Sequence, residues 1–213
     1  MKITALPPQK HDPDRLSVFV DGEFRMGLSA EVALAGNLRV GETVDEARLL
    51  ELERRDRGWQ AREAALRLLA VRPRSAAELA RRLRMKGYEP EIGEEVIVRL
   101  RDLGMIDDAA FAGTLVRDRV RLKPQGARRL ANELRAKGVD DETARAAIRE
   151  TMDGEQTDER ELARRAAEKW RPRAGEEPAR ARRRLHGYLA RRGFDSDVIR
   201  EVLDEATPDE TDE

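Results

Sequence analysis

The sequence contains no cysteine, few aromatic residues and no long apolar run. Without cysteine, the chain has no disulfide framework, no thiol catalysis and no cysteine-based zinc site. Aromatic residues make up only 4% of its 213 residues, so recognition by base stacking is poorly supported. No stretch approaches the roughly 18 apolar residues of a membrane span, and the N-terminus lacks the apolar core of a secretory signal. These absences favour a cytoplasmic protein that makes no membrane contact.

The motifs of nucleotide and metal enzymes are also missing. The sequence has neither G-x-x-x-x-G-K-[ST] nor G-x-G-x-x-G, and its two histidines, His11 and His186, do not form a zinc motif. Asp107-Asp108 is better interpreted as a helix N-cap, with Asp108 as the capping residue, than as a carboxylate pair for catalysis. Ser75 with Glu78 predicts a capping box. We therefore expect no enzyme, no cofactor and no metal.

What the sequence has in abundance is charge and helix-forming residues. Charged residues make up 40% of the chain, and Ala, Leu, Arg and Glu dominate it. Near its start, Leu16–Val20 and Glu23–Gly27 around the turn Asp21-Gly22 predict a β-hairpin, with 3–6 as a third strand. Ser29 is expected to cap a short helix over 30–35, and Thr43 with Glu46 to form a capping box for the next helix.

Three segments repeat one pattern of two leucines and a glycine, each four residues apart. They are Leu79, Leu83, Gly87; Leu130, Leu134, Gly138; and Leu185, Leu189, Gly193. The leucines bury one helix face, and the glycine supplies the left-handed conformation that ends a helix. Amphipathic stretches precede and follow each pattern. The sequence therefore predicts three-helix repeats, each with a small core of its own, stacked in an elongated, curved, mainly α array.

These patterns divide the chain into five parts. Residues 1–56 form the N-terminal β-hairpin and helical extension. The three repeats then cover 57–106, 107–153 and 154–206, and 207–213 form an acidic tail. The last ten residues, from Asp204 to Glu213, hold six acids and no base, which is typical of disorder.

The net charge of −1 hides a strong segregation. Residues 57–150 carry 21 basic and 15 acidic groups, a balance of +6, whereas the preceding segment is −3 and the following one is −4. Within 113–137, eight basic residues face only Asp118 and Glu133. Such a patch predicts binding of a polyanion, although arginine stems that cover apolar surface would produce the same composition.

The candidate docking residues come from the first two repeats. At helical spacing Arg117 and Arg121 share one face, while Arg119 and Lys123 share another that is offset by about 200°. We expect the first of these pairs to dock together with Arg128 and Arg129. The complete candidate set is Arg72, Arg74, Arg81, Arg82, Lys86, Arg117, Arg119, Arg121, Lys123, Arg128, Arg129 and Lys137.

Several motifs of the sequence resemble the RecX regulatory proteins, bacterial modulators of the RecA recombinase. The resemblance is carried by Arg72-Pro-Arg74-Ser75-Ala-Ala-Glu78-Leu79, Lys86-Gly87-Tyr88, Leu103-Gly104-Met-Ile106-Asp107-Asp108-Ala-Ala-Phe111-Ala112 and Gly126-Ala-Arg128-Arg129-Leu130. It continues through Glu133-Leu134-Arg-Ala-Lys137-Gly138-Val139. The third repeat matches by pattern more than by motif and carries an insertion with Pro172, Gly175 and Pro178.

The resemblance implies a monomeric, cofactor-free protein of DNA repair and homologous recombination. It would bind RecA and RecA–DNA filaments and inhibit filament extension, ATP hydrolysis and strand exchange, with weak DNA binding of its own. Two other classes stay open. A transcriptional repressor would use the helical hairpins as helix-turn-helix modules on a symmetric DNA site, and an interaction scaffold would bind no nucleic acid.

Overall fold

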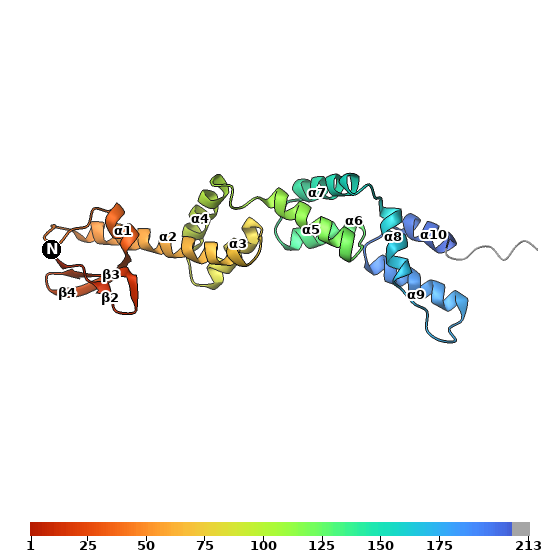
Figure 1. Cartoon of the computed structure of the whole chain (residues 1–213), viewed down its shortest axis with the longest axis horizontal. Coiled ribbons are helices and arrows are strands. Elements are labelled where there is room, and N and C mark those ends of the chain that lie inside the picture. Colours follow the sequence, from red (N-terminus) through yellow and green to blue (C-terminus); the bar gives the residue numbers. More distant parts are fainter. Residues whose placement is uncertain (206–213) are drawn as a thin grey trace, which may run out of the picture. The chain divides into compact units, whose positions relative to one another are not determined.

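The computed structural model describes residues 1–205, which fall into two compact units. The first comprises Met1–Pro73 and Leu79–Met105, and the second comprises Arg74–Glu78 and the chain from Ile106 onward. Helices dominate both units, and a small sheet lies near the N-terminus (Figure 1). The predicted mainly α class with a small β element is therefore confirmed.

The N-terminal sheet has four antiparallel strands: the predicted hairpin, the predicted third strand near residues 3–6, and one further strand. The long strand β3 (Asp12–Val20) pairs with β4 (Glu23–Ser29) on one side and with β1 (Ile3–Ala5) and β2 (Pro8–Gln9) on the other. Asp21 and Gly22, both with positive φ, form the predicted turn between β3 and β4. The buried face of the sheet, with Val18 and Leu28, packs against helices α1 and α2.

Helix α1 (Ala30–Ala35) begins at the predicted cap, because the Ser29 hydroxyl accepts a hydrogen bond from the backbone N–H of Val32 at 3.1 Å. The predicted capping box of Thr43 and Glu46 is wrong. Asp45 caps α2 (Glu46–Val71) by accepting from the N–H of Arg48 at 2.8 Å, and a carboxylate next to the first turn also interacts favourably with the helix dipole.

Helix α2 is a single helix of 26 residues, and the expected boundary between residues 56 and 57 falls inside it. Its first half packs on the sheet through Leu49 and Leu52, and its second half packs on α4. Asp56, which is 3% exposed, accepts from Arg15 at 2.8 Å and from the Ser29 N–H at 2.6 Å. The helix therefore belongs both to the N-terminal element and to the first repeat.

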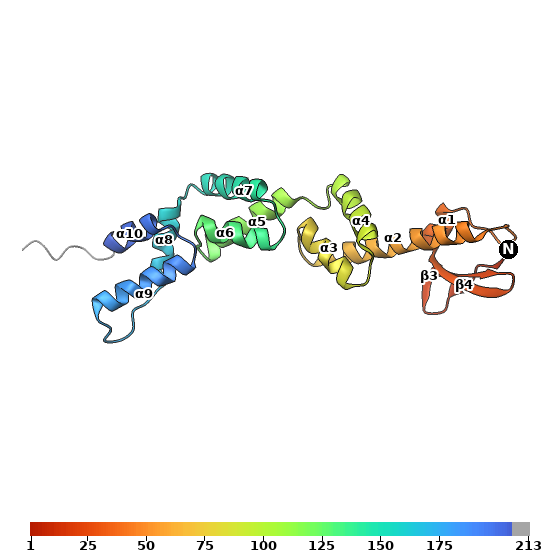
Figure 2. The same cartoon turned by 180° about the vertical axis from the view of Figure 1, so that it is seen from behind.

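Three-helix repeats follow along the chain, as predicted. The second half of α2, α3 (Ala76–Met85) and α4 (Pro90–Asp102) form repeat 1. Repeat 2 contains α5 (Asp108–Leu122), α6 (Ala127–Ala136) and α7 (Asp141–Gly154), with α7 beside α5 and α6 in both views (Figure 1 and Figure 2). Repeat 3 contains α8 (Glu159–Glu168), α9 (Pro178–Arg191) and α10 (Ser196–Glu205).

Repeats 2 and 3 share one hydrophobic core instead of the separate cores that the sequence suggests. Leu130 and Leu134 of repeat 2 and Leu185, Leu189 and Phe194 of repeat 3 belong to the same buried cluster. A repeat with so many charged residues buries little apolar surface alone, so a shared core gains burial for both. The arrangement of all three repeats as an elongated, curved array stays a prediction.

The three repeat glycines occupy equivalent turns, as predicted. Gly87, Gly138 and Gly193 have φ values of 86°, 79° and 83°, and each follows the second helix of its repeat. The residue after each glycine donates its N–H to a carbonyl five residues earlier: Tyr88 to Leu83, Val139 to Leu134 and Phe194 to Leu189. Each turn thus satisfies the helix end with the bonds of a Schellman motif.

Two local predictions need correction. Asp107 caps α5, accepting from Ala109 and Ala110 at 2.8 and 2.9 Å, whereas the predicted cap, Asp108, accepts from the N–H of Ala76. Asp204 and Glu205 are not part of a disordered tail, because they end α10 and pair with Arg182 and with Arg160 and Arg164. The predicted tail, 207–213, lies outside the described residues.

Candidate docking surface

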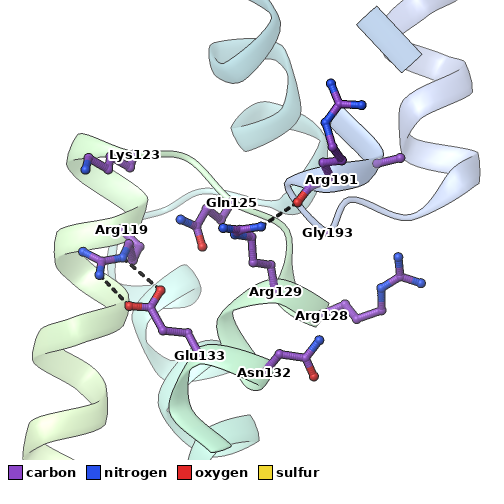
Figure 3. Close-up of a pocket in the computed structure, with 10 residues that line it drawn as sticks. Arg119, Lys123, Gln125, Arg128, Arg129, Asn132, Glu133, Arg191 and Gly193 are labelled. Atoms are coloured by element: carbon purple, nitrogen blue, oxygen red, sulfur yellow. Dashed lines mark hydrogen bonds and ion pairs between the residues drawn. The ribbon is translucent and has the colours of Figure 1, made fainter. Parts of the chain in front are cut away.

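The second unit contains an open groove of about 530 Å³ lined mainly by basic side chains, here called the basic groove. Figure 3 shows its residues. Arg119 and Lys123 come from the end of α5, Arg128 and Arg129 from the first turn of α6, and Arg191 from the end of α9. Gln125, Asn132 and Glu133 supply the other polar groups. Five basic residues therefore surround one acid, which is the charge balance of an anion-binding surface.

Among the described residues, Glu133 is the only acid that lines the groove, and it is already paired. The Arg119 guanidinium donates to its carboxylate, with Nε at 3.1 Å from Oε2. This hydrogen bond lowers the pKa of Glu133, against the opposing effect of burial, and raises the pKa of Arg119. The pair holds Arg119 in place, and Lys123, Arg128, Arg129 and Arg191 provide the remaining positive charge.

The Gln125 side chain lies in the wall of the groove. It is 8% exposed, and its Oε1 has no hydrogen-bond partner among the described residues. Figure 3 shows its amide directed toward the space between Arg119 and Arg129. Because a buried polar atom without a partner is uncommon and destabilising, this amide is a candidate ligand contact.

The groove forms where repeats 2 and 3 meet, here called the second joint. The N–H of Gly126 donates to the carbonyl of Arg192 at 2.9 Å, and Arg129 Nη1 donates to the carbonyl of Arg191 at 2.8 Å. A Cβ atom on Gly126 would lie 2.2 Å from the oxygen of Gly193, and one on Gly193 would lie 2.5 Å from the Cβ of Arg129. The backbones therefore approach so closely that only glycine fits at either position.

An equivalent first joint lies between residues 74–78 and repeat 2, all within the second unit. The Ser75 hydroxyl donates to the carbonyl of Lys137, and the N–H of Ala76 donates to the Asp108 carboxylate at 2.8 Å. A Cβ on Gly138 would lie 2.2 Å from the Cβ of Ala77. At the second joint, 51 residues further on, the N–H of Ala127 likewise donates to Glu159, at 3.2 Å.

Beside the first joint lies a buried ion pair. Arg74 and Glu78, whose side chains are 8% and 4% exposed, form an ion pair there. Arg74 was a candidate docking residue, but its guanidinium is buried and serves the joint. The Ser75 hydroxyl also accepts from the N–H of Glu78 at 3.1 Å, so the serine half of the predicted capping box is confirmed. The equivalent positions at the second joint hold Gln125 and Arg129.

The structure separates the four arginines that we expected to dock together. Arg117 and Arg121 do share a face, but both are directed toward Glu155, with Arg121 Nη2 at 2.7 Å and Arg117 Nε at 3.9 Å from its Oε1. Hydrogen bonding from Arg121 lowers the pKa of Glu155. Arg119 and Lys123, the other pair, line the groove with Arg128 and Arg129. Arg117 and Arg121 therefore do not line the basic groove with Arg128 and Arg129, and the docking role of these four arginines stays a prediction.

The other candidates lie elsewhere. Arg81, Arg82 and Lys86 are exposed on or just after α3, and no ion pair of theirs is found within residues 1–205. Arg72 is exposed and donates to the carbonyl of Pro73 at 3.0 Å. Lys137 is half-buried, and its carbonyl is held by Ser75. These residues do not line the basic groove.

Sequence reasoning missed three polar groups of the groove: Gln125, Asn132 and Arg191. The 55-residue spacing from repeat 2 gives no signal for Arg191, because it places Ala136 at the equivalent position. Within residues 1–205, no cluster of His, Cys, Asp and Glu could hold a metal ion. In the same range, no helix combines the length and apolarity needed to cross a bilayer.

Family models match four segments of the chain. The description "Regulatory protein RecX N-terminal domain" covers residues 1–45. The first, second and third three-helix domains of RecX match residues 61–100, 107–148 and 158–203.

Curated relatives and solved structures agree with these models. "Regulatory protein RecX" of Prosthecochloris aestuarii is 38% identical over 68% of this chain and 93% of its own length. The protein of the same name from Bacillus subtilis is 29% identical over 95% of this chain and 76% of its own. "Crystal structure of regulatory protein RecX" matches with a TM-score of 0.74 at 23% identity, covering 95% of this chain and 98% of the other. The RecX structure from Lactobacillus salivarius matches 70% of this chain and 96% of its own, with a TM-score of 0.61 at 26% identity.

Proposed function

Because this chain belongs to the RecX family of regulatory proteins, we propose that it is a negative regulator of the RecA recombinase. It binds RecA and RecA–DNA filaments and inhibits filament extension, ATP hydrolysis and strand exchange. It acts in the cytoplasm as a monomer, without a cofactor and without catalysis of its own.

The observation that carries this proposal is the basic groove. A nucleoprotein filament presents phosphates and acidic side chains, and a groove with five basic groups and one paired acid attracts such a surface. The exposed Arg81, Arg82 and Lys86 of repeat 1 add a second basic contact on the same chain. Two weak contacts joined by one chain bind more tightly than either alone.

Inhibition follows from occupancy. A bound protein of this size blocks the place where the next RecA subunit would add, and contacts with neighbouring subunits restrain the changes that accompany ATP hydrolysis. This mechanism needs no reactive group, in agreement with the absence of nucleotide-hydrolysis motifs from the sequence.

The test is RecA-dependent ATP hydrolysis on single-stranded DNA with and without the purified protein. We expect substoichiometric protein to lower the hydrolysis rate and strand exchange, because one bound molecule stops the extension of a filament that contains many subunits. An unchanged rate at molar equivalence with the cognate RecA would overturn the proposal. Binding instead to one symmetric duplex site as a dimer would favour a transcriptional repressor.

A further inference from the structure

The basic groove contains amide groups in addition to its basic side chains, so it offers hydrogen-bond acceptors that a simple anion could not pair with. Lys123, Arg128, Arg129 and Arg191 offer only donors, which suit phosphate oxygens. Gln125 and Asn132 add two amides, each with a donor and an acceptor. The unpartnered Oε1 of Gln125 is available to accept a hydrogen bond from an N–H or O–H of a ligand.

We propose that the basic groove holds one nucleotide unit of a single-stranded nucleic acid, with its phosphates against the basic side chains and its base edge against the Gln125 amide. The inference rests on the proposed function. It specifies that the basic groove binds the DNA of the filament and not the recombinase.

The shape and chemistry of the groove favour this ligand over two others. A volume of about 530 Å³ lies in the range of small-molecule pockets and accommodates a group the size of a nucleotide. The edge of an unpaired base offers both an N–H and an acceptor, which is the pairing that a glutamine amide makes with adenine. An acidic side chain of a protein offers acceptors only, so it would leave Oε1 without a partner.

The basic groove is lined by residues of two repeats, so a bound ligand should stabilise the second joint. Arg191 comes from repeat 3, whereas Lys123, Gln125, Arg128 and Arg129 come from repeat 2. A ligand that contacts both sides bridges the two repeats. We therefore expect binding of an oligonucleotide to raise the melting temperature of the second unit, because the ligand binds only the folded joint.

The experiment measures binding of labelled single-stranded oligo(dA) and oligo(dT) to the full chain by fluorescence anisotropy at several salt concentrations. The groove variant Lys123→Gln/Arg128→Gln is compared with Arg145→Gln/Arg149→Gln, which removes the same charge from exposed positions of α7. We expect the groove variant to lose about 10-fold or more in affinity, and its log–log salt slope to fall by about 1.4, or about 0.7 for each lost phosphate contact. The control should change both far less.

Gln125→Met separates a ligand contact from a structural role. Methionine keeps the length of the side chain and removes the unpartnered oxygen, so the variant should melt at the same temperature or higher. Affinity for oligo(dA) should nevertheless fall several-fold. A gain in stability with unchanged affinity for both oligonucleotides would overturn the role of Gln125.

Three further results would overturn the inference. One is an equal loss of affinity in the groove and control variants. Another is a poly-glutamate peptide that binds as tightly as the oligonucleotide, with the same dependence on Lys123 and Arg128, since the groove would then be a site for acidic protein. The third is a wild-type chain that inhibits RecA without binding free oligonucleotide; the proposed function would then stand and the groove assignment would fall. If the chain binds the oligonucleotide but does not inhibit RecA, the groove assignment would stand and the proposed function would fall.

Discussion

The first and second joints make contacts at equivalent positions but carry different side chains beside them. In both, the start of a second helix meets the glycine turn of the following repeat, and a carboxylate at the start of that repeat's first helix accepts the N–H of an alanine, Ala76 or Ala127. At the first joint a buried Arg74–Glu78 ion pair lies beside these contacts. At the second, Gln125 and Arg129 leave a basic groove. A repeated scaffold can therefore carry a structural pair in one copy and a binding site in the next.

Removing the buried carboxylate of the first joint should have the largest effect. Glu78→Ala removes a buried ion-pair partner of Arg74, which should cost about 3 kcal/mol in the free energy of unfolding. The comparison change in the basic groove, Glu133→Ala, removes a partly exposed partner of Arg119 and should cost about 1 kcal/mol or less. Urea denaturation measures both. Equal losses of stability in the two variants would contradict the expected difference between a buried and a partly exposed ion pair.

The close backbone approach at the second joint gives the next largest effect. Gly193→Ala places a Cβ against Arg129 in addition to the strain of a positive φ, and should cost about 2 to 3 kcal/mol. Gly87 is the control: its φ is almost the same, but an added Cβ meets nothing within 4 Å. Gly87→Ala should therefore cost only about 1 kcal/mol. If both variants unfold at the same denaturant concentration, the close packing around Gly193 contributes nothing to the free energy of unfolding.

Transplanting the pair of the first joint tests the comparison directly. The double variant Gln125→Arg/Arg129→Glu places an arginine and a glutamate where Arg74 and Glu78 stand 51 residues earlier. We expect its free energy of unfolding to stay within about 1 kcal/mol of the wild type, because the new ion pair offsets the lost bond from Arg129 to the Arg191 carbonyl. Affinity for oligo(dA) should fall by about 10-fold or more, since the groove loses positive charge and its amide. Retained affinity, measured by anisotropy, would argue against the groove as the binding site.

The smallest effect concerns pH at the second joint. Burial raises the pKa of Glu159 above its ordinary value of 4.5. Ionisation of Glu159 therefore destabilises the folded state at higher pH. This cost shrinks as the pH falls through the folded pKa, and it is gone below 4.5. Glu133 behaves oppositely: its lowered pKa gives stability above 4.5 that is lost as the pH falls through its folded value.

Glu159→Gln keeps an oxygen for the Ala127 N–H and removes the charge. At neutral pH we expect a gain of about 0.5 kcal/mol or less after solvent screening. Stability should then depend less on pH just above 4.5, which thermal melting across a pH series measures. A steeper dependence in the variant would contradict the assigned sign.

The sequence alone determined the repeats and their turns, because the signals involved are local. The leucine spacing, the three glycines and the serine cap at Ser29 each act within about two helical turns, so the same bonds form wherever the segment is placed. The family resemblance depended on the same short motifs. Charge segregation also identified the region that holds the basic groove.

Only the tertiary structure decided which side chains share a surface. Arg74 and Arg129 look alike in the sequence, yet packing of distant helices buries one and leaves the other at the groove. Helical spacing gave two possible faces of α5, and contacts with Glu133 and Glu155, 14 and 34 residues away from Arg119 and Arg121, assigned each face. Gln125 carries no signal of its own, because its role arises from neighbours that only the fold brings together.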